Sequence, residues 1–436
     1  MNATPESLPT VDLLGPCPSD VRIVPERRLY SFDPELLDID ALKVVRRLKR
    51  FGYQAYLVGG CVRDLLLGAQ PKDFDVVTSA RPAEIKQLFR NCRLIGRRFR
   101  LAHLHFKNQK IIEVATFRRE PTAEDDLSSR HAAQNLFGNE VDDAIRRDFT
   151  VNALMYDVEA KEILDWVGGL ADVESRTIRA IGEPQRRLPE DPVRILRAVK
   201  FAKKLDLRIE SELYAEMSRF SPLIAECSKA RLLEEMFKVL RSGYGATCLA
   251  MLHDIGALAH ILPGLDTSIQ ENGNASFALL EQADIWNRNH RNVSDALLLG
   301  ALLYPALETC IWEAQDVSKA LSAAFKPLVH PLQFTKKNMA TVRYACVVQR
   351  RMLRGPRNRR VKKLVDRDYA LEAVDLLELS GKAPAPVVEQ WRQLIASRMT
   401  QKKPAPGKPR ARRRRPPVKR TRTLKTSDGV QTAPKA

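Results

Sequence analysis

One stretch of the sequence decides how the first half of the chain folds, Leu57-Val58-Gly59-Gly60-Cys61-Val62-Arg63-Asp64. The apolar residues before the two glycines predict a strand, and residues 61–67 predict a helix that ends at Gly68. A glycine turn between a strand and a helix leaves backbone N–H groups free, and the helix adds the positive end of its dipole. The stretch therefore predicts a turn that binds phosphate.

A pair of acidic residues, Asp73 and Asp75, follows at the start of the next predicted strand. Residues i and i+2 of a strand point to the same face, and two carboxylates held that close repel each other unless a cation lies between them. Mg²⁺ prefers oxygen ligands, and two such ions activate an attacking hydroxyl and stabilise a leaving oxygen. The pair predicts a metal-assisted phosphate site with two Mg²⁺ ions.

Two further acids are candidates for a third carboxylate at this site. Glu113 lies on a later predicted strand, and Asp148 lies at the start of a predicted helix over residues 146–154. Each has an ordinary alternative role, Glu113 as a solvated strand residue and Asp148 as the N-terminal acid of its helix. The residue pattern leaves both alternatives open.

The composition of the 436-residue chain is that of a soluble globular protein, with 44% hydrophobic and 29% charged residues. The length allows several domains, and we find no apolar run as long as a membrane span and no secretory signal. The seven cysteines are scattered and never paired as C-x-x-C, which is typical of reduced thiols. We therefore expect a cytoplasmic protein with no membrane span.

The net charge of +19 indicates a polyanionic partner, for which nucleic acid is the best candidate. Residues 400–436 hold 13 Lys and Arg against one Asp, and the rest of the chain is basic as well. This tail is rich in Pro, Lys and Arg and cannot bury a core, so it is predicted to be disordered. Its arginine run is a candidate RNA contact, comprising Arg412, Arg413, Arg414 and Arg415.

Apolar spacing divides the folded part of the chain into two kinds of structure. Residues 56–167 alternate strands and helices as one compact α/β unit, and from residue 172 onward the pattern is helical. Pro189-Glu190-Asp191-Pro192 predicts the start of one of these helices. One flank of this helix carries a charged stripe, formed by Asp191, Arg194 and Arg197. If the stripe faces a cleft, it can recognise a nucleotide; if it faces water, it is only solvated.

Four motifs together resemble those of the class II nucleotidyltransferases, the family of the bacterial poly(A) polymerases and the CCA-adding enzymes. The resemblance covers about residues 41–240 and rests on Gly59-Gly60-x-Val62-Arg63-Asp64, Asp73-Phe74-Asp75, Arg146-Arg147-Asp148-Phe149-Thr150-x-Asn152-Ala153 and Glu190-Asp191-Pro192-x-Arg194. Four motifs in the family's order make the match specific for the superfamily. The chain departs from the usual pattern at Cys61, where Gly or Ala is common, and at Lys200, where Arg is usual.

The resemblance implies an α+β fold, with a small mixed-sheet nucleotidyltransferase head followed by all-helical neck, body and leg domains. The expected divisions are a flexible lead-in over 1–27, the catalytic head over 28–168, a neck for base recognition over 169–229, a body and leg for RNA binding over 230–400, and the disordered basic tail over 401–436.

The resemblance also implies roles for individual residues. Asp73 and Asp75 would hold the catalytic Mg²⁺ ions, with Asp148, in preference to Glu113, as the supporting acid. The nucleotide would be bound by the triphosphate contacts Gly59, Gly60 and Arg63, by Arg147 and Asn152, and by a base pocket of Asp191, Arg194 and Arg197.

The stretch from Cys92 to His103, with Arg97-Arg98-Phe99 at its centre, is similar to the poly(A) polymerases rather than to the CCA-adding enzymes, and a basic tail suits an enzyme that holds nonspecific RNA. We therefore predict a template-independent polynucleotide adenylyltransferase that adds AMP from ATP to RNA 3′ ends and releases pyrophosphate, in RNA polyadenylation and turnover. The alternatives are a CCA-adding tRNA nucleotidyltransferase and a non-catalytic RNA-binding protein. Protein partners in RNA decay are not identifiable from the sequence.

Overall fold

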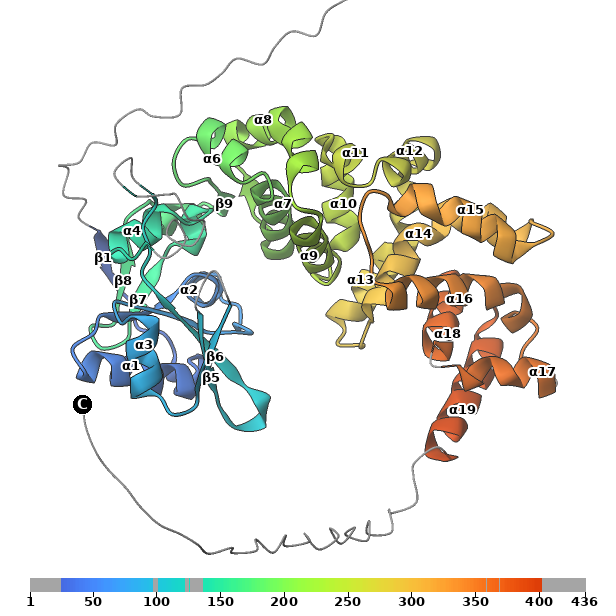
Figure 1. Ribbon diagram of the computed structural model, residues 1–436, viewed down its shortest axis with the longest axis horizontal. Helices are drawn as coiled ribbons and strands as arrows, with labels where there is room; N and C mark the ends of the chain where they lie inside the picture. Colours follow the sequence, from blue (N-terminus) through green and yellow to red (C-terminus); the bar gives the residue numbers. More distant parts are fainter. Residues whose placement is uncertain are drawn as a thin grey trace, which may run out of the picture.

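The computed structural model describes residues 25–96, 101–121, 125, 136–357, 359–367 and 369–401. The chain forms a curved body with a sheet and its helices at one end and a long helical arm over the rest (Figure 1). The predicted α+β fold is therefore confirmed, with a mixed-sheet head followed by helices. Two predicted features lie outside the described residues, the Arg97-Arg98-Phe99 segment and the tail with its arginine run.

The head is built on one eight-stranded sheet in the order β1-β8-β7-β2-β3-β6-β5-β4. β3 and β6 run parallel, whereas the other neighbouring pairs are antiparallel. The strands are β1 Glu26–Leu29, β2 Ala55–Val58, β3 Asp75–Thr78, β4 Cys92–Ile95, β5 Leu101–His105, β6 Ile111–Thr116, β7 Met155–Asp157 and β8 Glu162–Asp165. The sheet thus takes in Glu26 and Arg27, which the predicted lead-in had included.

Short helices pack on this sheet, namely α1 Ile39–Arg50, α2 Gly60–Leu66, α3 Pro82–Leu88, α4 Glu140–Ile145 and α5 Gly169–Glu174. Asp38 caps α1, because its carboxylate accepts hydrogen bonds from the backbone N–H groups of Asp40 and Ala41 at 2.9 and 3.0 Å. Apolar residues at helical spacing between 41 and 48 are buried, and α1 packs on β2 and β3. α1 therefore presents its charged residues to solvent.

The arm follows β9 Thr177–Ile178, which pairs in parallel with β10 Arg208–Ile209 within the arm. Its helices bury one continuous apolar core. They are α6 Pro184–Glu190, α7 Arg194–Leu205, α8 Ser211–Phe220, α9 Lys229–Leu240, α10 Gly245–Asp254, α11 Ala257–Ile261, α12 Pro263–Asn272, α13 Ala278–Arg288, α14 Asp295–Trp312, α15 Val317–Val329, α16 Lys336–Met352, α17 Arg359–Lys362, α18 Ala370–Leu379 and α19 Ala385–Gln401.

One arm helix, α14, is long and apolar enough by composition to cross a membrane, with 18 residues and a mean hydropathy of 1.3. From the sequence alone, no apolar run of that length and no membrane span are expected. Of this helix, 61% is buried inside the protein, and it packs on α13, α15, α16 and α18. Such burial is typical of the central helix of a helical core.

The predicted helix over residues 146–154 is wrong. The segment turns, forms a short 3-10 helix at Thr150–Asn152 and continues into β7. Its backbone bonds to a distant part of the chain, since Thr150 N–H donates to the carbonyl of Arg179 at 3.1 Å and Ile181 N–H donates to that of Asp148 at 3.2 Å. These long-range bonds replace the local bonds of a helix.

The predicted helix after residues 189–192 is present as α7, but Pro189 and Glu190 belong to the preceding helix, so the stretch joins two helices. α6 ends at Glu190, Asp191 has an extended backbone with φ −150° and ψ 83°, and α7 begins at Arg194. Proline explains the break, since Pro192 lacks an N–H and disfavours a helical conformation of the residue before it. Asp191 therefore lies outside the helix that carries Arg194 and Arg197.

Candidate active site

A tight glycine turn joins β2 to α2, as the sequence predicts. Gly59 has a φ of 72°, in the region that favours glycine. A Cβ atom at Gly59 would lie 3.2 Å from Nη1 of Arg147 and 3.3 Å from the carbonyl oxygen of Asn152. Glycine is therefore needed both for the backbone conformation and for the close approach of the strand that follows Asn152.

Arg63 of α2 is held rigidly beside this turn. Its side chain is buried and donates to Asp64 Oδ1 from Nε at 2.9 Å and from Nη2 at 2.6 Å. It also donates to Oδ1 of Asn152, and it lies over the ring of Phe201 on α7 at 5.0 Å. The guanidinium is thus fixed between the head and the arm.

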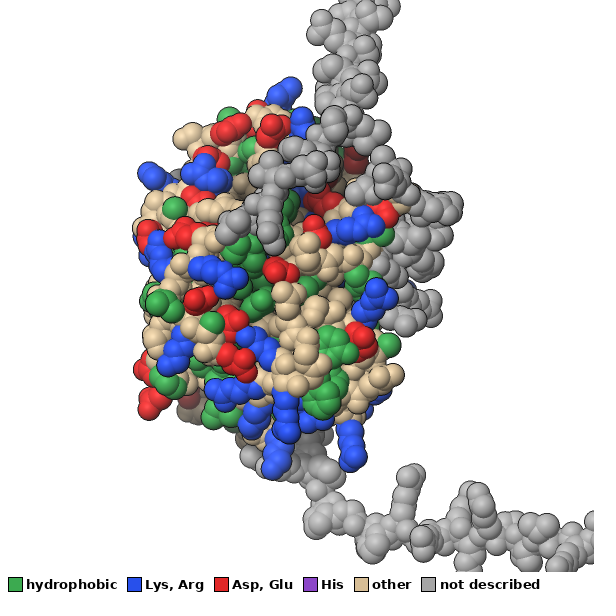
Figure 2. Space-filling view, turned by 90° about the vertical axis from the view of Figure 1, so that its left-hand side faces the viewer, with side chains coloured by type: hydrophobic (Ala, Val, Ile, Leu, Met, Phe, Trp, Pro, Cys, Tyr) green, Lys and Arg blue, Asp and Glu red, His purple; other side chains and the backbone are tan. Residues whose placement is uncertain are grey.

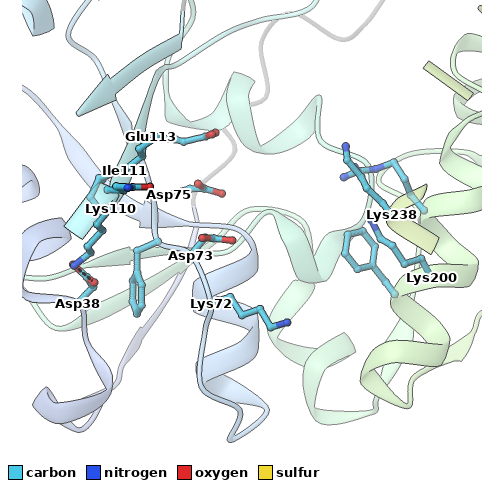
Figure 3. A pocket seen from close by; sticks show the side chains of 14 residues that line it. Asp38, Lys72, Asp73, Asp75, Lys110, Ile111, Glu113, Lys200 and Lys238 are labelled. Atoms are coloured by element: carbon cyan, nitrogen blue, oxygen red, sulfur yellow. Dashed lines mark ion pairs between the residues drawn. The ribbon is translucent and has the colours of Figure 1, made fainter. Parts of the chain in front are cut away.

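Three carboxylates point into one cavity beside the turn, those of Asp73, Asp75 and Glu113 (Figure 3). Asp75 and Glu113 are partners in the parallel register of β3 and β6, so the pleat directs both to the same face. Oε1 of Glu113 lies 3.3 Å from Nε2 of His103 on β5. Burial by the surrounding protein, then the charges of Glu113 and Asp73, raise the pKa of Asp75 to about 6.

We call this space the acidic cavity, with a volume of about 790 Å³. The head supplies the three carboxylates, and the arm closes the opposite side with Arg197, Lys200 and Phe201 of α7 and Lys238 of α9. Figure 3 shows Lys200 and Lys238 across the cavity from the carboxylates. Negative charge on one wall thus faces positive charge on the other.

A second space, the basic cavity, adjoins the first and has a volume of about 490 Å³. The two cavities share Asp75, Arg197 and Phe201 in their walls. All of the residues predicted to bind the nucleotide line the basic cavity, namely Gly59, Gly60, Arg63, Arg147, Asn152, Asp191, Arg194 and Arg197. The structure therefore brings the predicted nucleotide residues together next to the predicted metal ligands.

Asp148 lies in the basic cavity and not with the three carboxylates. Its Oδ2 accepts from Nε of Arg197 at 2.7 Å and from Nη2 at 2.6 Å, and its Oδ1 accepts from Nδ2 of Asn152 at 3.0 Å. Burial works against ionisation, yet the charge of Arg197 and the hydrogen bond from Asn152 hold the pKa of Asp148 below its usual range. Of the two candidates for the supporting acid, Glu113 thus lies with Asp73 and Asp75 in the acidic cavity, whereas Asp148 lines the basic cavity.

Asp143 of α4 is a supporting residue that the sequence analysis missed. Its buried carboxylate accepts from Nη2 of Arg147 at 2.7 Å and from Nε of Arg146 at 3.1 Å. This fixes Arg147, whose Nη1 also donates to the carbonyl of Asn152 at 3.3 Å. The acid four residues before Arg147 was the available signal.

The arm adds further residues that the sequence analysis missed, because they come from α9. Nη2 of Arg231 donates to Oδ2 of Asp191 at 2.6 Å, while Oδ1 of Asp191 is buried and has no hydrogen-bond partner among the described residues. Nη1 of Arg194 donates to the carbonyl of Arg187 at 2.8 Å. Asp191 therefore lines the cavity with one carboxylate oxygen paired to Arg231 and one buried oxygen that the described residues leave without a hydrogen bond.

Lys200 lies beside an acid of α9, Glu235. Its Nζ is 3.9 Å from Oε2 of Glu235, and Lys238 donates to Oε1 of the same carboxylate at 2.8 Å. Burial, then the neighbouring charge of Arg197, lower the pKa of Lys200 to about 8. Lys200 is thus a weakly basic amine on the arm side of the acidic cavity.

The donor set of the acidic cavity suits Mg²⁺ in kind. It consists of carboxylate oxygens, and the charges of Glu113 and Asp73 contribute to the raised pKa of Asp75, a repulsion that a divalent cation would relieve. Within the part of the chain that the structure describes, no three Asp, Glu, His or Cys side chains are close enough together to hold a metal ion. The carboxylates converge on the cavity but stand apart from one another.

Two family models match the chain in the parts that form this site. The first is described as the Poly A polymerase head domain and matches residues 55–179. The second is described as the probable RNA and SrmB-binding site of polymerase A and matches residues 206–269, which include α9. The matched segments thus contribute walls to both cavities.

Among individual relatives, poly(A) polymerase I of Salmonella typhi is 37% identical over 438 residues, covering 92% of this chain and 94% of that protein. A CCA-adding enzyme of Enterococcus faecalis is 39% identical over 310 residues, covering 69% of this chain and 71% of that protein. The crystal structure of Bacillus stearothermophilus CCA-adding enzyme in complex with CTP superposes with a TM-score of 0.61 at 26% identity, covering 82% of each chain.

Proposed function

The chain belongs to the poly(A) polymerase family and is a nucleotidyltransferase, and on this premise we propose that it adds AMP from ATP to RNA 3′ ends without a template. The observation that carries the proposal is the junction of the two cavities at Asp75. A nucleoside triphosphate in the basic cavity would present its α-phosphate at this junction. An RNA 3′-hydroxyl entering from the acidic cavity would meet it there, and pyrophosphate would leave.

The acidic cavity would hold the metal ions through Asp73, Asp75 and Glu113. Bound Mg²⁺ would supply Lewis-acid stabilisation of the phosphate oxygens and a more acidic 3′-hydroxyl. The raised pKa of Asp75 fits a site that awaits a cation, since its ionised form is disfavoured by burial and by neighbouring carboxylates.

The basic cavity supplies the groups that hold the triphosphate. Arg63 and Arg147 are fixed by Asn152, Asp64 and Asp143, so their remaining N–H groups are oriented before a ligand arrives. The backbone at Gly59 lies close to Arg147, because no side chain keeps the two apart. A rigid pair of guanidinium groups beside a bare turn favours a polyphosphate and orients its reacting end.

The base would be selected at Asp191. Its free Oδ1 accepts a hydrogen bond from an exocyclic amino group, which adenine and cytosine carry, whereas uracil presents a carbonyl oxygen at the equivalent position. A buried acceptor that meets another acceptor is left unpaired, which is costly. Asp191 thus accounts for selection of ATP or CTP against UTP, and the choice between ATP and CTP requires other contacts.

A CCA-adding activity is the second candidate, since CCA-adding enzymes are among both the sequence relatives and the structural neighbours. The match to poly(A) polymerase I covers a larger share of this chain than the match to the CCA-adding enzyme, which favours adenylation. The cytoplasmic location, the role in RNA turnover and the RNA contact of the arginine run in the tail belong to the same proposal.

One assay separates these activities. The purified full chain is incubated with Mg²⁺, a generic RNA oligonucleotide and each nucleoside triphosphate in turn. We expect long tails with ATP alone and release of pyrophosphate. Addition that stops after a few nucleotides, uses CTP and needs a tRNA acceptor would instead identify a CCA-adding enzyme, and absence of pyrophosphate with every substrate would leave only RNA binding.

A further inference from the structure

A groove of about 470 Å³ leads out of the acidic cavity along the head. Lys72, Phe74 and Lys110 line both spaces, so the groove and the cavity adjoin each other. The groove reaches Ile39 and Lys43 in the first turns of α1. Its acids are largely neutralised, because Lys110 forms ion pairs with Asp38 and Asp40.

A stripe of exposed cations continues from the end of this groove along α1. It consists of Lys43, Arg46, Arg47 and Arg50, which recur at i, i+3, i+4 and i+7 and therefore share one face of the helix. α3 lies alongside, since Nε of Arg47 donates to the carbonyl of Leu88 at 3.2 Å. The stripe thus extends over a second element.

Beyond that contact lie three more exposed cations, Lys86 of α3, Arg90 between α3 and β4, and Arg93 of β4. Figure 2 shows Lys and Arg side chains gathered at the lower end of the outer face of the head, the end at which Figure 1 places α1 and α3. We call one set of these cations the basic track, comprising Lys72 of the groove, Lys43, Arg46 and Arg50 of α1, Arg90 between α3 and β4, and Arg93 of β4.

A charged helix face is ordinarily just solvated. On this face of α1, however, most of the cations have no acidic side chain within the described part of the chain as an ion-pair partner. Among the described residues, no acidic side chain lies within ion-pair distance of Arg46, Arg50, Arg90 or Arg93, whereas Lys43 pairs with Asp40 at 3.2 Å. Like charges four residues apart, as at Arg46 and Arg50, destabilise a helix. A polyanion laid along the track would remove this repulsion.

An exposed aromatic ring stands at the far end of the stripe. Phe51, the residue after α1, is 53% exposed, and the guanidinium of Arg47 lies 5.5 Å from its ring centre. At the groove end, Ile39 is 67% exposed. Cations that follow a backbone, combined with an exposed ring on which a base can stack, are the features that bind single-stranded nucleic acid.

We propose that the basic track binds the RNA strand upstream of its 3′ end, with phosphates along the cations and a base stacked on Phe51. The inference rests on the proposed function, because the strand would leave the acidic cavity through the groove. RNA is favoured over other polyanions because the track begins at the three carboxylates where the RNA 3′ end would react. The head thereby holds substrate separately from the arm and the tail.

The test compares two double variants of the full chain that lose the same charge. Arg46→Gln/Arg50→Gln alters the track, whereas Arg27→Gln/Arg186→Gln removes exposed arginines that pair with Glu162 and Glu183. Dissociation constants are measured over a range of salt for primers of about 4 and about 16 nucleotides, lengths that bracket typical single-strand sites. Thermal unfolding verifies that each variant is folded.

We expect the track variant to bind the long primer about tenfold more weakly and to flatten the slope of log K against log salt by about 1.4, or about 0.7 per lost contact. Binding and extension of the short primer should not change. Phe51→Ala should weaken binding of the long primer without altering the slope, since stacking releases no counterions.

Several results would overturn the proposal. Equal weakening by both double variants would mean that only net charge matters, and unchanged binding of the long primer would remove the track altogether. A third result concerns vesicles of anionic phospholipid. If they bind the wild type but not the track variant, and RNA binding is unaffected, the basic track is a membrane-binding surface. A wild type that neither binds nor extends the short primer would refute the proposed function itself, and the track with it.

Discussion

Asp148 of the head and Arg197 of α7 form a two-pronged ion pair, with Oδ2 of the carboxylate 2.7 Å from Nε and 2.6 Å from Nη2 of the guanidinium. Oδ1 of the same carboxylate accepts from Asn152, which in turn accepts from Arg63. Asp148 is therefore committed to a network that joins the head to the arm. Its charge orients Arg197 at the junction of the two cavities.

We predict that Asp148→Asn destabilises the protein, because it leaves the charge of Arg197 without its main partner. The loss should lie near the lower end of the roughly 3–5 kcal/mol typical of a broken buried pair, since the side chain of Arg197 is 30% exposed. Denaturant unfolding measures it. In the double variant Asp148→Asn/Arg197→Met the two effects should be much less than additive. Additive losses would contradict the pairing, and an intact fold with abolished chemistry would restore Asp148 to the metal site.

Glu113→Gln should have the opposite effect to Asp148→Asn, with a loss of activity and no loss of stability. We expect AMP addition to fall by more than about 100-fold, since even outer partners of metal ligands typically account for about 10–100-fold. The free energy of unfolding at neutral pH should stay constant or rise, because the repulsion between Glu113 and Asp75 is removed. Single-turnover assays and thermal unfolding measure the two quantities. The matched control is Glu162→Gln on β8, and a comparable loss of activity there would discount the role of Glu113.

Asp191→Asn tests the selection of the base. An amide presents either a donor or an acceptor, so it accommodates uracil as readily as adenine. We expect the KM for ATP to rise by more than about tenfold, because a hydrogen bond to a charged group is worth roughly 1.5–3 kcal/mol and a factor of ten corresponds to about 1.4 kcal/mol. Incorporation of UTP relative to ATP should increase. Competition assays with mixed nucleotides measure the ratio. An unchanged preference for ATP over UTP would show that another residue reads the amino group.

Removal of residues 402–436 tests the tail, which carries Arg412–Arg415. The segment from 400 onward holds 13 Lys and Arg, and each phosphate contact to single-stranded RNA contributes about 0.7 to the salt slope. We expect weaker RNA binding, a shallower slope and an unchanged rate of AMP addition at saturating RNA. A slope equal to that of the full chain would exclude the tail from RNA binding.

The strand, turn and helix around Gly59 could be predicted from the sequence because local signals encode them, namely an apolar run, a residue that needs positive φ and a helical repeat. The segment that contains Asp148 could not, because its backbone bonds to Arg179 and Ile181. Short-range periodicity carries no information about such partners.

The sequence could not place Glu113 beside Asp75 for a similar reason, although it named Glu113 as a candidate. The pairing of Asp75 with Glu113 depends on the parallel register of β3 and β6, which are joined by a long crossover that includes β4 and β5. Arg231 and Glu235 reach the site from α9 by packing of the arm. The motifs thus predicted which residues gather at the site, whereas the tertiary structure assigns their partners.

Lys200 gives rise to a prediction about pH. Its pKa is about 8 in the native state, against an ordinary value of 10.5. Below pH 8 the amine is protonated in both states, and the native state carries the full cost of burying the charge. Between pH 8 and 10.5 the unfolded chain keeps a proton that the native state has released, so native stability rises with pH. Above pH 10.5 this gain in the free energy of unfolding is complete and amounts to on the order of 3 kcal/mol.

Lys200→Met should remove this gain, since methionine has no charge to bury. The stability of the wild type minus that of Lys200→Met should therefore increase between pH 8 and 10.5 and stay level below pH 8. Denaturant unfolding at a series of pH values measures the difference, which cancels other groups that titrate in the same range. Lys107→Met, at an exposed position in the turn between β5 and β6, is the control that should show no such increase. Parallel curves for the wild type and Lys200→Met would mean that Lys200 keeps its proton in the native state, and that its ion pair with Glu235 outweighs burial.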